Sequence, residues 1–394
     1  MAENNKIKVA FLGGLHSVHD EMISFGPPGI EFKVYYPQIK DLLFWLSHRA
    51  GINIVPSIME DVIHSYNRVV LNRRNWVLEI EHISSPRRWV GSGITNLLLN
   101  TLREKIMDNK SKMRIPGILD LVKQYVVINS LKSSYCKKII AWSNWAITDR
   151  SSPLYSPFEK KIIETKEIAD KFCVVYPAMK PRKSKIHARN GKDLKLLFVG
   201  NGFFRKGGDI VIRAFQELKG KYHLSLTIVS NFEGEIHYNQ TKSIGLSIKD
   251  VLIKDEKVIW LTNVDRETML NKVYLDHDIF VMPTNADLFA FSIIEAMHSK
   301  LPIISTKIGA IPEMVEDGVN GFLLESPVNN YGPAWDDEQR ETVKNALVEK
   351  ITLFAENSRL IKEMGEVSSE IAREKFSYQL RNEKLKEVYL EAYE

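Results

Sequence analysis

The most constraining feature of this sequence is a repeated alternation of short apolar runs with longer segments of helical periodicity. Strand-like runs occur in the first half at Ile7–Leu12, Phe32–Tyr36, Arg68–Leu71, Trp76–Ile80, Lys138–Trp142 and Phe172–Tyr176. Longer stretches separate these runs, and Ile39–Arg49 has apolar residues at helical spacing. Strands that alternate with helices predict a parallel sheet with helices packed on its faces.

The alternation breaks at residues 177–193 and then starts again. Pro177 and Pro181 open the break and polar residues follow, as is typical of a linker between domains. A second series of expected strands runs through Leu194–Val199, Leu224–Val229, Val258–Leu261, Ile279–Met282 and Pro302–Ser305. Helical stretches near residues 208–219, 266–275 and 292–299 lie between them. The fold class expected is therefore α/β, with two Rossmann-like doubly wound domains.

The chain has 394 residues, which is more than one hydrophobic core normally supports. We expect one domain over residues 1–180 and a second over residues 181–394. Three amphipathic helices, roughly Glu338–Glu356, Ser358–Arg373 and Tyr378–Tyr393, end the sequence, and the last can pack back on the N-terminal domain. Two facing domains of this kind leave a cleft between them, and ligands lie there at the carboxyl ends of the strands.

Cysteine content and the first apolar run narrow the class of protein. Only Cys136 and Cys173 are present, in no metal-ligand spacing, so neither a disulfide scaffold nor a zinc site is expected. A cytoplasmic location is the simplest expectation. Because Ile7–Leu12 is far too short to span a bilayer, neither a secretion signal nor a transmembrane helix is expected.

The net charge of +5 is concentrated in the first half of the chain. Arg73–Arg74, Arg87–Arg88 and Lys105–Arg114 could meet phosphate-bearing acceptors or the inner face of an anionic membrane, or form a solvated basic face. Nucleic acid binding is not expected, because the basic residues are scattered and no recognition motif accompanies them.

The segment from Pro283 to Glu313 carries the clearest chemical pattern. A buried strand is expected to end at Pro283 and a helix to open near Ser292, so that Asp287 and Glu295 can face the same cleft. Carboxylates accept hydrogen bonds from pairs of sugar hydroxyls. The amides from Phe289 to Ile293, at the positive end of this helix, are suited to a diphosphate.

A structural alternative exists for this helix start. Ser292 and Glu295 stand at the spacing of a capping box, in which the glutamate satisfies a backbone amide instead of a ligand.

The segment resembles the signature of glycosyltransferase family 4, the retaining group 1 enzymes of the GT-B fold. That signature has two glutamates separated by seven residues, then a strand and a turn that are similar to Leu301–Ser305 and Gly309–Glu313. Val315–Phe322 continues the pattern. Asp287, which is one methylene shorter, stands where the family usually has the first glutamate. The resemblance implies that Asp287 contacts the donor sugar and Glu295 the ribose.

A second block, Phe198–Asp209, is similar to the family's strand, glycine loop and Lys-Gly sequence. The resemblance implies that Arg205 and Lys206 neutralise the leaving diphosphate, and Gly200 lets the backbone approach the ligand. The family often has arginine where this chain has Asn201. The alternative is a basic pair on the surface before a helix.

In the first half, Gly13 and Gly14 look like the family's glycine loop, and His82 like its donor-contacting histidine. His82 can equally be a loop histidine whose partners are structural. Asp276–Asp278 mimics a metal motif, but it lies where the family has a helix end, and His16 and His19 have no further ligand, so no metal is expected.

The resemblance implies a metal-independent hexosyltransferase without a cofactor, which takes a UDP- or GDP-sugar donor and a glycan or lipid-linked acceptor. Catalysis is assigned by resemblance to Lys206, Arg205, His82 and Asp287. Donor contacts are assigned to Gly13, Gly14, Gly200, Asn201, Arg205, Lys206, Asp287, Phe289, Ala290, Phe291, Ser292 and Glu295. The segments Leu42–Arg49 and Arg87–Leu99 suggest peripheral membrane contact. The alternatives are a nucleotide-sugar epimerase or hydrolase of the same fold, and a non-catalytic nucleotide-sugar-binding protein.

Overall fold

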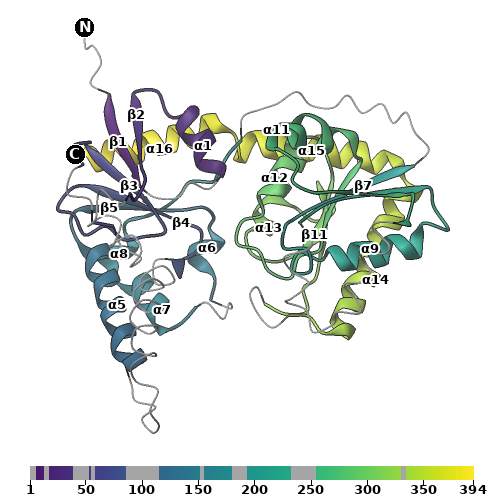
Figure 1. Ribbon diagram of the computed structural model, residues 1–394, viewed down its shortest axis with the longest axis horizontal. Coiled ribbons are helices and arrows are strands. Elements are labelled where there is room, and N and C mark those ends of the chain that lie inside the picture. The colour runs from purple at the N-terminus through teal and green to yellow at the C-terminus, as the bar shows by residue number, and fades with distance from the viewer. Residues whose placement is uncertain are drawn as a thin grey trace. The chain divides into compact units, whose positions relative to one another are not determined.

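A computed structural model of the chain describes residues 6–12, 17–38, 53–54, 58–85, 115–150, 155–179, 193–231, 254–329 and 334–394. The chain divides into two compact units (Figure 1). Unit 1 comprises residues 1–150, 154–178 and 378–394, and unit 2 comprises residues 151–153 and 179–377. The final helix thus belongs to unit 1, although the chain reaches it from unit 2.

Among the residues that the structure describes, each unit has a six-stranded sheet whose paired strands are all parallel. The order in unit 1 is β2-β1-β3-β4-β5-β6. Its strands are β1 (Ile7–Leu12), β2 (Ile30–Tyr35), β3 (Val62–Tyr66), β4 (Trp76–Ile80), β5 (Cys136–Ala141) and β6 (Phe172–Val174). The order in unit 2 is β12-β11-β10-β7-β8-β9. Its strands are β7 (Leu194–Val199), β8 (Leu224–Val229), β9 (Val258–Leu261), β10 (Ile279–Met282), β11 (Ile303–Thr306) and β12 (Gly321–Leu324).

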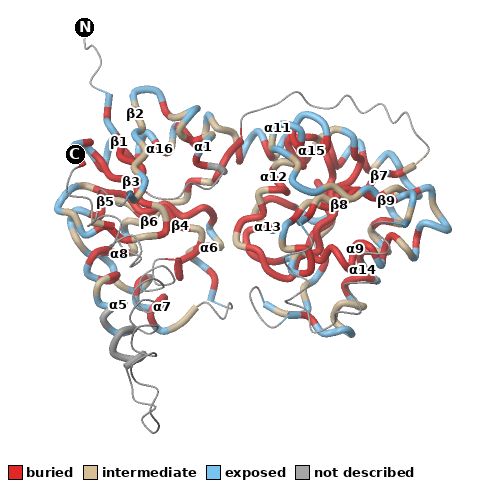
Figure 2. Tube along the Cα trace, in the orientation of Figure 1, coloured by how far each residue is buried: buried red, intermediate tan, exposed pale blue. Residues whose placement is uncertain are grey.

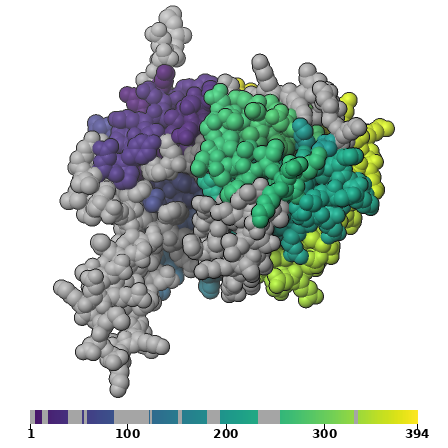
Figure 3. Space-filling model, turned by 45° about the vertical axis from the view of Figure 1, so that its right-hand side comes forward, coloured from purple at the N-terminus to yellow at the C-terminus, as the bar shows by residue number. Residues whose placement is uncertain are grey.

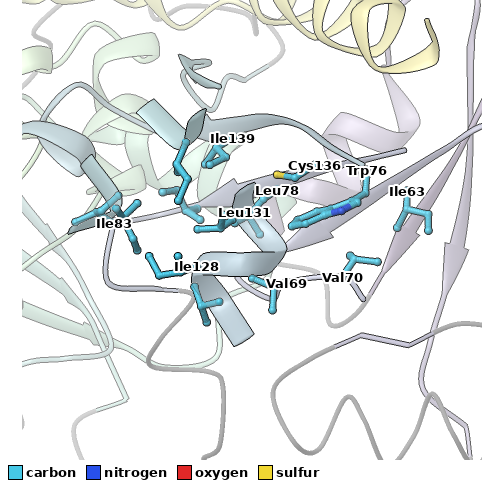
Figure 4. Packing of buried hydrophobic residues seen from close by; sticks show 14 of the residues in the cluster. Ile63, Val69, Val70, Trp76, Leu78, Ile83, Ile128, Leu131, Cys136 and Ile139 are labelled. Carbon is cyan, nitrogen blue, oxygen red and sulfur yellow. The ribbon is translucent and has the colours of Figure 1, made fainter. Parts of the chain in front are cut away.

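Both faces of the unit 1 sheet are buried, because its apolar runs place alternate side chains on opposite faces. Val9 and Phe11 pack in a cluster with α1 and α16, whereas Ala10 and Leu12 pack in a second cluster with α5, α7 and α8. The second cluster includes Trp76, and Figure 4 shows this residue with Leu78, Leu131 and Cys136 among the labelled members. The helices are α1 (Ser17–Ser24), α5 (Ile115–Lys132), α6 (Trp145–Thr148), α7 (Pro157–Glu164), α8 (Lys166–Ala169) and α16 (Tyr378–Tyr393).

The sheet of unit 2 also lies between helices. α9 packs with α14, and α12 packs with α15, and the central strands are buried (Figure 2). The helices are α9 (Gly208–Leu218), α11 (Arg266–Thr268), α12 (Phe291–His298), α13 (Ile311–Met314), α14 (Asp337–Glu356) and α15 (Ser358–Lys375). A π-helix, Met269–Val273, and a 3₁₀-helix, Tyr274–Asp276, directly follow α11.

The expectation of two doubly wound parallel sheets is confirmed. The bounds of β4, β7, β8, β9, β10 and α16 coincide with the predicted ranges. The prediction of a strand at Arg68–Leu71 is wrong, since this segment forms only an isolated bridge between Val70 and Asn53. Asn67 has a positive φ of 57°, and the hydroxyl of Ser65 donates to the carbonyl of Arg68. The chain therefore turns here instead of extending.

A buried polar cluster lies within unit 1 and consists of His19, His64, Glu79, Trp142 and Tyr389. Nε2 of His19 lies 3.1 Å and Nε2 of His64 lies 2.9 Å from Oε2 of Glu79. The indole N–H of Trp142 donates to Oε1 of Glu79. Nδ1 of His64 lies 2.6 Å from the Tyr389 hydroxyl. The cluster thus ties α1, β3, β4 and the end of β5 to α16.

The helices in the described part of the chain include none that is both long enough and apolar enough to cross a bilayer. The segments Leu42–Arg49, Arg87–Leu99 and Lys105–Arg114 lie outside the described residues.

Candidate functional site

The sheet of unit 2 changes direction at the pair β7 and β10. β7 lies between β8 and β10 in the sheet. The chain that leaves β7 runs to β8, on one side, and the chain that leaves β10 runs to β11, on the other side. In open α/β sheets the carboxyl ends of two such strands form the usual ligand site. The loop after β7 carries Arg205 and Lys206, and the loop after β10 carries Asp287.

Backbone hydrogen bonds hold these two loops together. The amide of Asn285 donates to the carbonyl of Arg205 over 2.8 Å, and the hydroxyl of Thr284 donates to the same carbonyl over 3.2 Å. The guanidinium of Arg205 donates to the carbonyl of Ala286. The two loops are therefore one connected structure, although they are about 80 residues apart.

The predicted basic pair and the predicted carboxylate meet in this structure. Nζ of Lys206 lies 3.3 Å from Oδ2 of Asp287, and Nη1 of Arg205 lies 3.8 Å from the same oxygen. The side chain of Lys206 is 17% exposed and that of Arg205 is 41% exposed. Because both cations retain accessible surface, an anion arriving from solvent can reach them, and Asp287 occupies the position between them.

Two glycines permit this close packing. A Cβ atom added to Gly200 would lie 2.4 Å from Cδ of Lys206. Gly207 has a φ of +78°, and its Cβ would lie 2.2 Å from the carbonyl oxygen of Pro283. Only glycine allows both the left-handed conformation and this approach of the two loops.

A cavity of about 480 Å³ is lined in part by Gly200, the glycine against which Lys206 packs. It lies at the carboxyl ends of β7, β8 and β9, and it is lined by Val199, Gly200, Asn201, Val229, Ser230, Asn231, Asn263, Val264 and Met269. The side-chain Nδ2 of Asn231 donates to Oδ1 of Asn263 over 3.0 Å. Figure 3 shows one face of the surface of unit 2, with the earlier part of the unit in teal and the later part in green.

Asn231 and Asn263 were missed by reasoning from the sequence alone. Each stands two residues beyond a correctly predicted strand, which is the signal that could have identified them.

Glu295 lies in the second turn of α12 and accepts hydrogen bonds from two side chains. Nη1 of Arg266 donates to Oε1 over 2.8 Å, and the hydroxyl of Tyr274 donates to Oε2 over 2.7 Å. The capping-box alternative is wrong, because α12 begins at Phe291 with Ala290 as its N-cap and has no side-chain cap. The hydroxyl of Ser292 instead contacts the sulfur of Met282 at 3.6 Å.

The first turn of α12 uses some of its amides within the chain. The N–H of Phe291 donates to the carbonyl of Phe289, and that of Ile293 donates to the carbonyl of Ala290. Phe289 and Phe291 also pack against each other, with ring centroids 5.1 Å apart. An anion at the start of α12 would therefore interact chiefly with the helix dipole and not with these two N–H groups.

The remaining candidates lie in unit 1. The side chain of His82 has no exposed surface, its Nδ1 accepts from the amide of Ser84, and its Nε2 lies 3.6 Å from Oδ2 of Asp149. These contacts match the alternative of a histidine with structural partners. Gly13, Gly14 and His16 lie outside the described residues.

Two side chains of the segment Asp276–Asp278 have partners within the chain. His277 contacts the carbonyl of Val273 and the hydroxyl of Thr227, and Asp278 accepts from the amide of Lys195. Within the ranges that the structure describes, no group of three or more His, Cys, Asp and Glu side chains could hold a metal ion.

Comparisons with known proteins find similarity to glycosyltransferases. Residues 179–331 match the family Glycosyl transferases group 1. The uncharacterized glycosyltransferase MJ1178 of Methanocaldococcus jannaschii is 24% identical over 355 residues, which cover 88% of this chain and 79% of that protein. The D-inositol 3-phosphate glycosyltransferase of Segniliparus rotundus is 29% identical over 135 residues, but these cover only 33% of this chain and 28% of that protein.

Solved structures resemble this chain over nearly its full length. Anabaena Alr3699/HepE in complex with UDP and glucose aligns with a TM-score of 0.62 and 16% identity, covering 97% of this chain and 98% of that one. Sucrose-phosphate synthase of Thermosynechococcus elongatus aligns with a TM-score of 0.60 and 12% identity, covering 98% of this chain and 99% of that one. The chain therefore has the GT-B fold, and its residues 179–331, which carry the site at β7 and β10, match the group 1 glycosyl transferases.

Proposed function

We propose that the protein is a retaining glycosyltransferase that moves a hexosyl group from a UDP- or GDP-sugar to a hydroxyl of a glycan or lipid-linked acceptor. The observation that carries the proposal is the convergence of Lys206, Arg205 and Asp287 at the point where the sheet of unit 2 changes direction. This site lies within the residues that match the group 1 glycosyl transferases.

The surroundings of this cluster support a nucleotide-sugar donor. The cavity beside Gly200 has room for a nucleobase, and amide side chains on its wall can pair with base edges. Lys206 and Arg205 are suited to the diphosphate. Glu295 would accept hydrogen bonds from ribose, and Asp287 from the sugar. Anabaena Alr3699/HepE, which shares the fold, was crystallised with UDP and glucose, and this also favours a donor of this class.

Binding of the donor would change the partners of Asp287. A diphosphate carries more negative charge than one carboxylate, so it would replace Asp287 as the main partner of the two cations. The carboxylate would then be able to accept hydrogen bonds from hexosyl hydroxyls. The ion pair between Lys206 and Asp287 keeps these two groups beside each other, which supports the proposed exchange of partners.

The chemistry follows from where charge develops. As the bond between the sugar and the diphosphate breaks, its electron pair goes to the phosphate oxygen, and Lys206 and Arg205 stabilise the growing charge. The acceptor oxygen forms the new bond on the face that the diphosphate leaves, so the anomeric configuration is retained. The departing phosphate takes the acceptor's proton. This route uses no protein nucleophile and no metal ion.

The acceptor and the location in the cell are proposed from the basic character of the first half. We propose a cytoplasmic protein that contacts the inner face of the membrane through unit 1. Binding to vesicles with anionic headgroups would support this location, and equal recovery with neutral vesicles would count against it.

The test begins with donor choice. UDP-, GDP- and ADP-hexoses are screened by thermal shift, since a bound ligand raises the apparent stability. The donor that gives the largest shift is then incubated with and without a panel of glycan and lipid-linked acceptors. Transfer only in the presence of acceptor, with a retained anomeric configuration by NMR, supports the proposal.

Other outcomes identify the alternatives. Product formed from the donor without an acceptor identifies an epimerase or hydrolase. Tight binding without turnover across the panel identifies a non-catalytic nucleotide-sugar-binding protein. No thermal shift with any of the three nucleotide classes overturns the proposal.

A further inference from the structure

The two side chains that hold Glu295 come from a segment without an assigned role. Arg266 opens α11, and Tyr274 opens the 3₁₀-helix that follows the π-helix Met269–Val273. One side of Glu295 is held by a cation and the other by a phenol, so each carboxylate oxygen accepts one of these hydrogen bonds. A carboxylate held at both oxygens cannot rotate about its last bond.

The π-helix explains how both residues reach the same carboxylate. Eight residues of an ideal α-helix rotate about 800°, so Tyr274 would stand roughly 80° away from Arg266 around the axis. The i→i+5 bonding of a π-helix makes a wider turn and reduces the rotation per residue. The Met269–Val273 segment therefore brings Tyr274 toward the face of Arg266, and Met269 itself lines the cavity.

Tyr274 is a permanent donor in this arrangement. Its side chain is fully buried, and burial together with the negative charge of Glu295 raises the pKa of Tyr274 well above its ordinary value. The phenol therefore keeps its proton at any physiological pH.

The held carboxylate still has hydrogen-bonding capacity. A carboxylate offers about four acceptor directions, so two donors from the chain can coexist with donors from a ligand. Two neighbouring hydroxyls, such as those of ribose, require two acceptors in a defined plane. A carboxylate that is fixed before the ligand arrives binds them without a further loss of rotational freedom.

We propose that Arg266 and Tyr274 are positioning residues that orient the Glu295 carboxylate toward the two ribose hydroxyls of the nucleotide, so that the site distinguishes ribonucleotides from 2′-deoxyribonucleotides. This inference rests on the proposed function and adds two residues and a selectivity to it. The segment 266–274 thereby sets which pentose the site accepts.

The experiment compares the dissociation constants of UDP and GDP with those of their 2′-deoxy forms by calorimetry. The wild-type protein is expected to bind the better ribonucleotide at least about 10-fold more tightly than its deoxy form, as one charge-assisted hydrogen bond allows. Glu295→Gln, Tyr274→Phe and Arg266→Gln should each reduce this ratio at least about 3-fold, and Arg266→Lys should retain more of it than Arg266→Gln does.

The ratio is measured within one variant, so a general loss of stability cancels between the two ligands. Tyr222→Phe removes a phenol that donates to Glu356, and Arg213→Gln removes a guanidinium that pairs with Glu341, both within unit 2. These two controls should keep the wild-type ratio. Loss of the ratio in either control would mean that discrimination does not depend on the segment 266–274.

Failure of the inference and failure of the proposed function give different results. If the wild-type protein binds neither UDP nor GDP, the proposed function fails and this inference fails with it. If it binds one of them but does not discriminate the deoxy form, or if Tyr274→Phe and Arg266→Gln both keep the wild-type ratio, only the positioning role is overturned.

Discussion

Glu79 in unit 1 and the two site carboxylates of unit 2 have partners that differ in exposure. In unit 1, Glu79 accepts from His19, His64 and Trp142, which come from three different parts of the fold. In unit 2, Asp287 and Glu295 are held by cations whose side chains remain 17% to 41% exposed. When the partners of a carboxylate are buried side chains of the chain itself, the polar cluster supports the fold. When the partners are partly exposed and border a cavity, a ligand can replace one of them. The two cases differ more in how exposed the partners are than in how deeply the carboxylate is buried.

The largest effect is expected from a substitution that disrupts the buried polar cluster around Glu79. Glu79→Gln removes the charge that its neighbours solvate, and disruption of a buried ionic group of this kind costs about 3–5 kcal/mol. Because the two units need not unfold together, amide hydrogen exchange should show the loss in β1, β3 and β4. Equal loss of protection in β7 and β10 would contradict a role confined to unit 1.

Removing a cation from the cluster of Lys206, Arg205 and Asp287 should leave the fold intact and lower the rate of transfer. Lys206→Ala is expected to lower the transfer rate at least ~100-fold, since it removes a donor to the developing charge. Lys219→Ala is the matched control, because Lys219 also pairs with a carboxylate, Asp255, but away from the site. Transfer by Lys206→Ala at nearly the wild-type rate would remove this residue from the mechanism.

One added methyl group at the place where the loops after β7 and β10 meet should lower both stability and transfer. Gly207→Ala and Gly318→Ala both place a side chain at a positive φ, +78° and +77°, but only the Cβ of Gly207 meets a backbone atom. The conformational cost, about 1–2 kcal/mol, is common to both. Gly207→Ala should therefore lower the melting temperature further and also reduce transfer, while Gly318→Ala keeps the wild-type rate. Identical behaviour of the two variants would mean that the contact with Pro283 has no effect.

The smallest effect is a pH dependence that belongs to unit 1. Burial alone would raise the pKa of Glu79, but the charges and hydrogen bonds of His19 and His64 outweigh it and hold this pKa well below its usual 4.5. The stabilisation is therefore complete above about pH 4.5 and is lost as the pH falls through the depressed pKa. One group contributes a slope of at most about 1.4 kcal/mol per pH unit. Hydrogen exchange of unit 1 between pH 3 and 6 should show this slope in the wild type but not in Glu79→Gln.

Much of the fold was predictable because strands and helices have short-range signals. The apolar runs at Trp76–Ile80 and Leu224–Val229 become strands with the predicted bounds. The exception at Arg68–Leu71 has an apolar pattern, but the positive φ of Asn67 and the bond from Ser65 turn the chain. Local composition does not reveal such a competing turn.

The site was predictable only in part. Lys206 and Asp287 stood out from motif spacing, and the structure places them 3.3 Å apart. Arg266 and Tyr274 gave no signal, since their bonds to Glu295 span 29 and 21 residues and depend on a π-helix. Pairing over such separations is a property of the folded chain.

The membership of α16 in unit 1 has a consequence for the order in which the protein matures during synthesis. Tyr389 completes the polar cluster, and Leu385 and Val388 complete the core on one face of the sheet. The ribosome makes residues 378–394 only after all of unit 2. Unit 1 therefore cannot complete its fold until α16 emerges, and one apolar face of its sheet stays exposed to water until then. Slow translation or a stop codon before residue 378 would leave a nascent chain that chaperones bind, even though its second half has folded.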